Sequence, residues 1–232
     1  GRYQNDPEKL KQALEERGIS LAALTVPFTW ANDEETQEEK ERADYYIDYL
    51  TNFPGAVLNL PSRVGPNRNH LLERQKQIIA CANAVGKRAY EKGVQASFHP
   101  ASPETSYFRT KADYDVLFEL LDTSYMSYTP DAGHIKAGGM RPEDIIKDNL
   151  SIIKHVHFKD RSNSNEWKEM GTGDIDFPYI VQTLKDSGYQ GWIMIEEETK
   201  EAAEDPNKVI LNVGKYVKEN LKPIANGVEK ND

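Results

Sequence analysis

The sequence predicts an α/β fold built on parallel strands, and two observations lead to this prediction. Short β-rich runs alternate with helical patterns along all 232 residues, and loops rich in Gly, Pro or His follow the strands. Alternation of this kind is typical of βαβ units, in which helices cover both faces of a parallel sheet. The length suits one α/β barrel, so we expect a single domain over 1–232.

The N-terminal half begins with a helix rather than a strand. Asp6 precedes Pro7, which suits the first turn of a helix over 7–17, and Gly18 ends that helix. The alternation then predicts strands at 19–24, 56–60 and 94–99 and helices at 38–49 and 71–92. A loop over 61–69 separates the second strand from the long helix.

The C-terminal half continues the same order of strands and helices. We expect strands at 126–131, 153–158 and 191–196, and helices at 111–121, 142–150, 177–187 and 206–221. Pro130 weakens the first of these strands because proline has no N–H to donate to a sheet. Gly188 ends the helix before the last strand.

Six predicted strands leave two architectures open. A closed (β/α)8 barrel needs eight strands, and this chain opens on a helix. Either the first one or two strands of a barrel are missing from this chain, or the sheet is open and doubly wound.

Composition and charge exclude several classes of protein. The net charge of −9 argues against a nucleic-acid partner, which requires a basic surface. No apolar run is long enough to span a bilayer, so we expect no membrane partner, and we recognise no signal peptide. The single cysteine, Cys81, excludes an intrachain disulfide and favours a cytoplasmic location.

Polar residues stand at the ends of four predicted strands. His99 ends one strand, Asp131 ends the next, His157 lies at the end of the following one, and Glu196 ends the last. Because the carboxyl ends of parallel strands lie on one face, which is where such folds bind ligands, we expect these side chains to converge. Nitrogen and oxygen ligands of this kind predict a divalent metal site for Mn²⁺, Zn²⁺, Co²⁺, Mg²⁺ or Fe²⁺.

Each of these residues also has a simpler interpretation. A single histidine at a strand end is more often a hydrogen-bonded structural residue. His155 shares the parity of His157, so both point to one face, and we expect the deeper His155 to be packed or to support the ligands. The acidic run 196–198 alone would be a solvated turn, but Glu196 directly follows an apolar strand and therefore needs a partner or a metal.

Four segments resemble the xylose isomerase-like TIM-barrel superfamily, in its sugar phosphate isomerase/epimerase branch. They are PDAGH (130–134), IKHVHFKD (153–160), GTGDIDF (171–177) and GYQGWIMIE (188–196). They occur in the family's order and spacing, and the resemblance runs from Asp6 to the last helix. It implies a (β/α)8 barrel whose N-terminal strands are missing from this chain.

The resemblance also implies a metal ion at the barrel mouth, with Mn²⁺ as the first expectation. Its ligands are typically Glu, Asp, His and Glu, which implies Asp131, His157 and Glu196 here. Where the family has the first Glu, this chain has His99, as in inosose dehydratase-like members. His99 or Glu104 is therefore the fourth candidate ligand.

Substrate contacts are implied by the same resemblance. His134, three residues after the ligand Asp131, matches a substrate-contacting histidine, and Lys159 and Arg161 occupy positions that often bind substrate. Glu196, His134 and Lys159 are the catalytic candidates. Aromatic residues in loops on this face can stack on a sugar ring or pack in the core and rim; they are Phe28, Trp30, Tyr107 and Trp167, with Trp30 as the substrate-binding candidate.

The function implied is a metal-dependent sugar isomerase or epimerase that acts on a keto-sugar or cyclic polyol ketone through an enediolate. An inosose-type dehydratase on the same scaffold and a non-catalytic sugar-binding protein are the alternatives. An endonuclease IV-type DNA repair enzyme, which shares this barrel, is disfavoured by the acidic charge and by the few histidines. A homo-oligomer is a further expectation, since exposed strand edges favour association.

The sequence leaves open whether the substrate carries a phosphate. Arg63 and Arg68 in the loop 61–69 offer two guanidinium groups, but a solvated loop is the simpler interpretation. We place Cys81 in the core as a small residue of an amphipathic helix.

Overall fold

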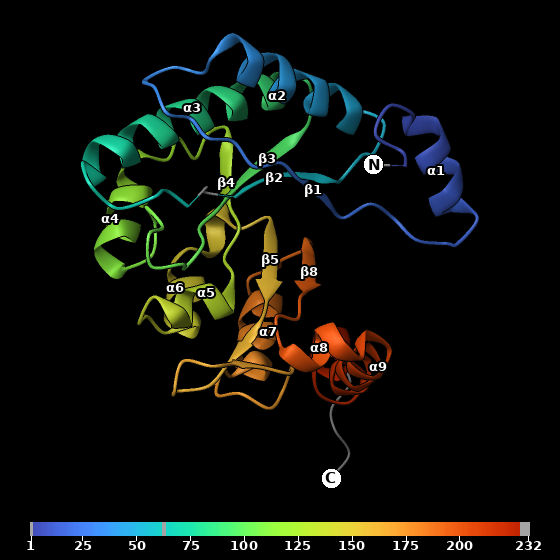
Figure 1. The fold of residues 1–232 in the computed structure, drawn as a ribbon. Helices are drawn as coiled ribbons and strands as arrows, with labels where there is room; N and C mark the ends of the chain where they lie inside the picture. Colours follow the sequence, from blue (N-terminus) through green and yellow to red (C-terminus); the bar gives the residue numbers. More distant parts are fainter. Residues whose placement is uncertain (1, 62–63, 228–232) are drawn as a thin grey trace. The chain divides into compact units, whose positions relative to one another are not determined.

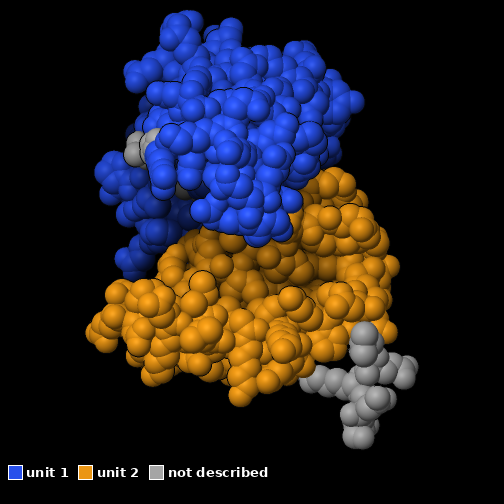
Figure 2. Space-filling view, turned by 90° about the vertical axis from the view of Figure 1, so that its right-hand side faces the viewer, with its two compact units in different colours: residues 1–108, 112–129 blue, residues 109–111, 130–232 orange. Residues whose placement is uncertain are grey.

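The computed structural model describes residues 2–61 and 64–227, so Arg63 lies outside the described residues. The chain divides into two compact units, one of residues 1–108 and 112–129 and the other of residues 109–111 and 130–232 (Figure 2). The expectation of a single domain over 1–232 stays a prediction.

The first unit is built on a four-stranded parallel sheet. Its strands follow one another in chain order as β1 (Ala23–Thr25), β2 (Val57–Pro61), β3 (Gln95–His99) and β4 (Met126–Tyr128). The register places Asn59 beside Ser97 and Pro61 beside His99. The parallel pairing confirms the predicted α/β class for this unit.

The first unit also contains amphipathic helices. They are α1 (Pro7–Glu15), α2 (Gln37–Leu50), α3 (Leu71–Glu91) and α4 (Lys111–Leu120). Figure 1 shows α2 and α3 along one side of the sheet, where α2 packs against β2 and α3 against β3. Thr36 and Glu39 form a capping box that fixes the start of α2. Ile47, Leu58 and Ile78 belong to the resulting core.

The second unit contains a two-stranded parallel sheet and a short antiparallel hairpin. β5 (His155–Phe158) pairs with β8 (Trp192–Ile195), and β6 (Asp160–Arg161) pairs with β7 (Trp167–Lys168). Asp131 forms an isolated parallel bridge with His157. The strand expected at 126–131 is shorter, since β4 ends at Tyr128, and the Pro130 carbonyl accepts a hydrogen bond from the His157 N–H at 2.8 Å.

Helices and short helical turns surround these strands. They are α5 (Ala132–Ala137), α6 (Pro142–Asp148), η1 (Leu150–Ile152), α7 (Phe177–Asp186), α8 (Lys200–Glu204), α9 (Pro206–Tyr216), a π-helical turn η2 (Val217–Leu221) and α10 (Lys222–Asn226). The rings of Phe158 in β5 and Phe177 in α7 lie 4.7 Å apart between centroids. Apolar contacts of this kind hold α7 against β5.

Several boundaries differ from the predicted ones. The strand expected at 19–24 is β1 (Ala23–Thr25). The helix expected at 206–221 consists of α9 followed by the π-helical turn η2, and the separate helix α10 comes after it. The elements α5, α8, β6 and β7 were not predicted, because two to six residues are too few to show a clear hydrophobic period. None of the helices among the described residues is long and apolar enough to cross a membrane.

Candidate functional site

Strand β5 supplies two histidines to one face of the second unit. His155 is fully buried and His157 is 4% exposed, and their rings meet edge-on with centroids 4.9 Å apart. They share a face because alternate residues of a strand point to the same side. The deeper His155 is packed inside, as expected, while His157 reaches the polar cluster at the end of the strand.

The N-terminus of α5 holds Asp131 and His134 together. Asp131 is the N-cap, and its Oδ1 accepts the His134 N–H at 2.9 Å. Its Oδ2 lies 4.0 Å from His157 Nδ1 and 3.9 Å from His134 Nε2. The buried Asp131 carboxylate thus faces both imidazoles.

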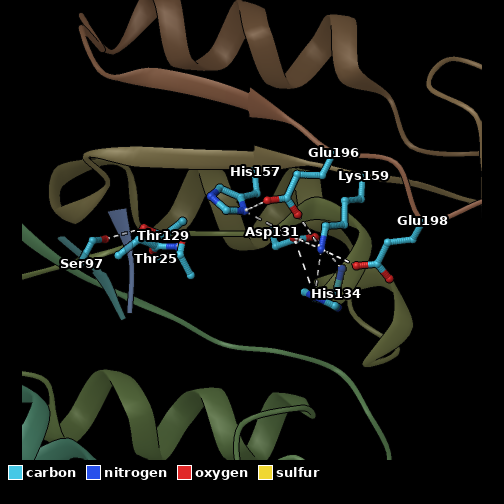
Figure 3. Close-up of polar contacts among 10 residues, drawn as sticks. Thr25, Ser97, Thr129, Asp131, His134, His157, Lys159, Glu196 and Glu198 are labelled. Atoms are coloured by element: carbon cyan, nitrogen blue, oxygen red, sulfur yellow. Dashed lines mark hydrogen bonds and ion pairs between the residues drawn. The ribbon is translucent and has the colours of Figure 1, made fainter. Parts of the chain in front are cut away.

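Lys159 lies at the centre of the cluster (Figure 3). Its ammonium Nζ is 2.7 Å from Glu196 Oε2, 2.7 Å from Glu198 Oε1 and 3.4 Å from Asp131 Oδ2. Burial acts to lower the pKa of Lys159, but the surrounding carboxylates outweigh it and hold the pKa above its usual value. Lys159 therefore carries a positive charge and can donate hydrogen bonds, but it is not poised to accept a proton.

Glu196 completes the cluster directly after β8. Its N–H donates to the Phe158 carbonyl at 3.0 Å, which continues the pairing of β8 with β5, and its Oε1 lies 3.2 Å from His157 Nδ1. Burial acts to raise the pKa of Glu196, but contacts with His157 and Lys159 lower it to about 2. Glu196 is therefore a carboxylate at neutral pH.

This lowered pKa predicts a loss of stability in acid. Since the folded-state pKa of Glu196 lies below the ordinary value of 4.5, its contribution is present above that value and is lost as the pH falls toward 2. The free energy of unfolding of the metal-free protein, measured by urea titration, is expected to fall over this range more steeply than that of the Glu196→Gln variant. Identical pH profiles for the two proteins would contradict the assignment.

The donor set fits a divalent metal ion. Asp131, His157 and Glu196 offer carboxylate oxygens and an imidazole nitrogen from three separate segments, and all three converge on one side of the second unit. Mn²⁺, Zn²⁺ and similar ions accept such mixed oxygen and nitrogen ligands. The position of the Lys159 ammonium among two of these carboxylates shows that the cluster has an excess of negative charge to neutralise.

The other predicted metal ligands belong to the first unit. His99 is buried at the end of β3 in the first unit, and Glu104 is exposed in the following loop. Their roles as alternative metal ligands stay predictions. Arg68 forms an ion pair with Asp113, with its Nη2 2.6 Å from Oδ1, so this side chain is already engaged within the first unit.

The two remaining substrate candidates have different surroundings. Trp30 is only 1% exposed, and its ring stacks on Phe28 with centroids 5.0 Å apart. The sequence left open whether Trp30 stacks on a substrate or packs against other side chains, and these contacts favour packing. Arg161 lies in the hairpin of the second unit, with its guanidinium 4.1 Å from the ring centroid of Trp167. Substrate binding by Trp30 and Arg161 stays a prediction.

Sequence reasoning missed the part that Glu198 plays in the cluster. The acidic run was interpreted as a solvated turn apart from Glu196, yet Glu198 forms the ion pair with Lys159. A signal was present, since Glu196 and Glu198 are two residues apart and extended chain places such residues on one side. Gly133 was also missed: a Cβ there would lie 2.5 Å from Trp167 Cζ3 and 2.8 Å from Lys159 Cβ.

Asp160 organises the loop that follows the cluster. Its Oδ2 accepts the N–H groups of Gly171 and Gly173, each at 2.9 Å, and its Oδ1 accepts the Arg161 N–H at 2.8 Å. The glycine motif at 171–173 is therefore folded around a buried carboxylate. Burial raises the pKa of Asp160, against the effect of these N–H donors.

Parallel strands whose carboxyl ends carry a cluster of carboxylates, imidazole and ammonium define an α/β protein with a polar site at its strand ends. The chain belongs to the xylose isomerase-like TIM barrel family, whose model matches residues 1–220. The TIM-barrel fold expected from the resemblance is thereby confirmed.

The relatives of this chain are enzymes. An inosose dehydratase of Clostridium perfringens (strain 13 / Type A) is 26% identical over 249 aligned positions, which cover 94% of this chain and 82% of that protein. An inosose dehydratase of Lacticaseibacillus casei is also 26% identical, with coverage of 93% and 82%.

Solved structures show the same fold at lower identity. The IolI protein with a bound zinc atom superposes with a TM-score of 0.72 at 16% identity, covering 99% of this chain and 85% of IolI. The apo form of 3-keto-D-glucoside 4-epimerase, YcjR, from E. coli has a TM-score of 0.70 at 18% identity, with coverage of 91% and 85%.

Proposed function

We propose that this chain is a divalent-metal-dependent isomerase or epimerase that moves a proton beside the carbonyl of a keto-sugar or cyclic polyol ketone. The observation that carries the proposal is the convergence of Asp131, His157 and Glu196 around the Lys159 ammonium. Such a site combines ligands for a metal with a positive group that can stabilise an oxyanion.

Asp131, His157 and Glu196 would hold the metal, with His99 or Glu104 as a fourth ligand. We propose Mn²⁺, with Zn²⁺, Co²⁺, Mg²⁺ or Fe²⁺ as alternatives; the zinc in IolI supports a divalent ion in this fold. When bound, the ion supplies Lewis acidity that polarises a carbonyl and makes the neighbouring C–H group more acidic.

The chain's own residues divide the remaining work. The ionised Glu196 removes the proton from the carbon beside the carbonyl and returns it. Lys159, which its raised pKa keeps charged, donates a hydrogen bond to the developing oxyanion. His134, whose Nε2 is 3.4 Å from Lys159 Nζ, orients a substrate hydroxyl and is the second candidate for moving the proton. Arg161 contributes a further substrate contact from the hairpin.

Three reactions share an enediolate and differ in the step that follows it. Its return to the neighbouring carbon is isomerisation, and its return to the opposite face is epimerisation. Loss of a hydroxide from the next carbon, which leaves as water with a proton from the site, is dehydration. The inosose dehydratases at 26% identity support this lyase reaction as the second candidate function. A cytoplasmic location and a homo-oligomeric state are also proposals.

The test follows C–H exchange in D₂O by proton NMR, with Mn²⁺-loaded protein and a panel of keto-sugars and inososes. We expect loss of the signal beside the carbonyl, and the product distinguishes an isomer or epimer from a dehydrated ketone. Metal content, measured by mass spectrometry, is expected to fall from about one ion per chain to well below it in the Asp131→Ala variant. A fully loaded protein that exchanges no C–H proton would instead favour a non-catalytic sugar-binding protein.

A further inference from the structure

A cavity of about 520 Å³ opens in the second unit. Its walls come from β7, from the loop after β7, and from the segment that begins at Glu198 and enters α8. The volume lies within the range of small-molecule binding pockets. The catalytic roles proposed above do not use this space, and only the expectation that Trp167 can stack on a sugar ring concerns it.

The cavity borders the candidate active site through Glu198. This side chain lines the cavity, and its Oε1 is 2.7 Å from Lys159 Nζ at the centre of the polar cluster (Figure 3). A group held in the cavity would therefore lie beside a substrate held at Lys159. The cavity can therefore bind the unreactive part of a substrate whose reactive part is held at Lys159.

Trp167 provides a fixed aromatic wall. The Arg161 guanidinium lies 4.1 Å from its ring centroid, and Arg161 is itself held by Asn165, whose Oδ1 accepts its Nε–H at 2.6 Å. The His134 ring meets the indole edge-on at 5.6 Å, and the absence of a side chain at Gly133 allows the close approach. A rigid indole that lines a polar cavity suits the C–H face of a sugar ring.

The negative charge of the cavity lining favours uncharged sugars over anionic ones. Four glutamates outnumber the two lysines: Glu166, Glu169, Glu198 and Glu201 against Lys168 and Lys200. Lys168 forms an ion pair within the lining, since its Nζ lies 2.9 Å from Glu166 Oε2. Such a lining accepts hydrogen bonds from hydroxyl groups, whereas it repels a phosphate or carboxylate.

We propose that this cavity binds an uncharged second ring, so that the substrate is an unphosphorylated glycoside whose keto ring reacts at Lys159 and Glu196. We call it the second-ring cavity. The inference rests on the proposed function, because it assigns a substrate class to the same site. Trp167 is the specificity-determining residue, and Glu198 joins the cavity to the reacting ring.

The test measures binding by calorimetry with probes that cannot react: methyl glucoside, methyl cellobioside and glucose 6-phosphate. We expect the disaccharide to bind about tenfold more tightly than the monosaccharide, and the phosphorylated sugar to bind more weakly than either. Trp167→Ala is expected to abolish the advantage of the second ring, and Trp167→Phe to keep most of it. Glu204→Gln, on the same helix but outside the lining, serves as the control and should keep the full preference.

Equal binding of the two glucosides, or a preference that survives in a folded Trp167→Ala variant, would overturn the proposal. Tighter binding of the phosphorylated sugar would overturn it as well. The binding experiment is independent of catalysis. Turnover of keto-monosaccharides without a second-ring preference would refute the proposed role of the cavity and leave the proposed reaction standing. A second-ring preference in a protein that exchanges no C–H proton would refute the proposed reaction and leave the role of the cavity standing.

Discussion

Replacing Glu196 with Gln is expected to lower kcat by about 10²- to 10⁴-fold while the protein remains folded. The amide keeps the shape of the side chain, but it cannot take a proton, and it binds a divalent ion more weakly than a carboxylate does. Steady-state turnover at saturating Mn²⁺, with the metal content of each preparation measured, gives the loss in proton transfer separately from the loss of metal.

The neighbouring residue provides a matched control. Glu197 lies one position further along the chain. Its Oε1 accepts a hydrogen bond of 2.9 Å from the Met170 N–H, which is not part of the cluster around Lys159. Because a Gln side chain retains such an acceptor, Glu197→Gln should turn over substrate at close to the wild-type rate. Near-normal turnover by a folded, metal-loaded Glu196→Gln protein would remove Glu196 from the proposed mechanism.

The Lys159→Met substitution is expected to destabilise the metal-free protein by about 3 kcal/mol, because a buried ion pair loses only its cation. The Lys159 side chain is 6% exposed and that of Asp131 is fully buried, so the carboxylate would remain without its nearest ammonium. Methionine fills a similar volume, which limits the loss of packing. Added Mn²⁺ should restore more stability to this variant than to the wild type, since the ion replaces the missing positive charge.

Urea unfolding with a chelator and with Mn²⁺ measures both effects. The double variant Asp131→Asn with Lys159→Met is the control, because it removes the buried negative charge together with the positive one. It should recover part of the stability without metal and lose the response to Mn²⁺. Equal stabilities for the wild type and Lys159→Met in the chelator would show that Lys159 does not neutralise the cluster.

Much of the site follows from periodicity and from strand ends. The equal parity of His155 and His157 placed them on one face, and the position of Glu196 after an apolar strand placed it beside buried structure. The three-residue spacing of Asp131 and His134 corresponds to the N-cap and first turn of α5. Each of these features depends on neighbours in the chain, which is why a linear pattern reveals it.

Contacts between distant segments were decided by packing. The family resemblance made Lys159 a candidate but did not show its ion pairs. The pairing of β5 with β8 brings Glu196 and Glu198 to its ammonium. The hairpin of β6 and β7 is two residues long on each side, too short for a period, and it carries Trp167 onto Gly133. The sequence alone determined the order of strands and helices and the approximate position of each strand, because burial and alternation are local. The tertiary structure determined which charges meet, because Coulomb energies depend on distances that only the folded chain sets.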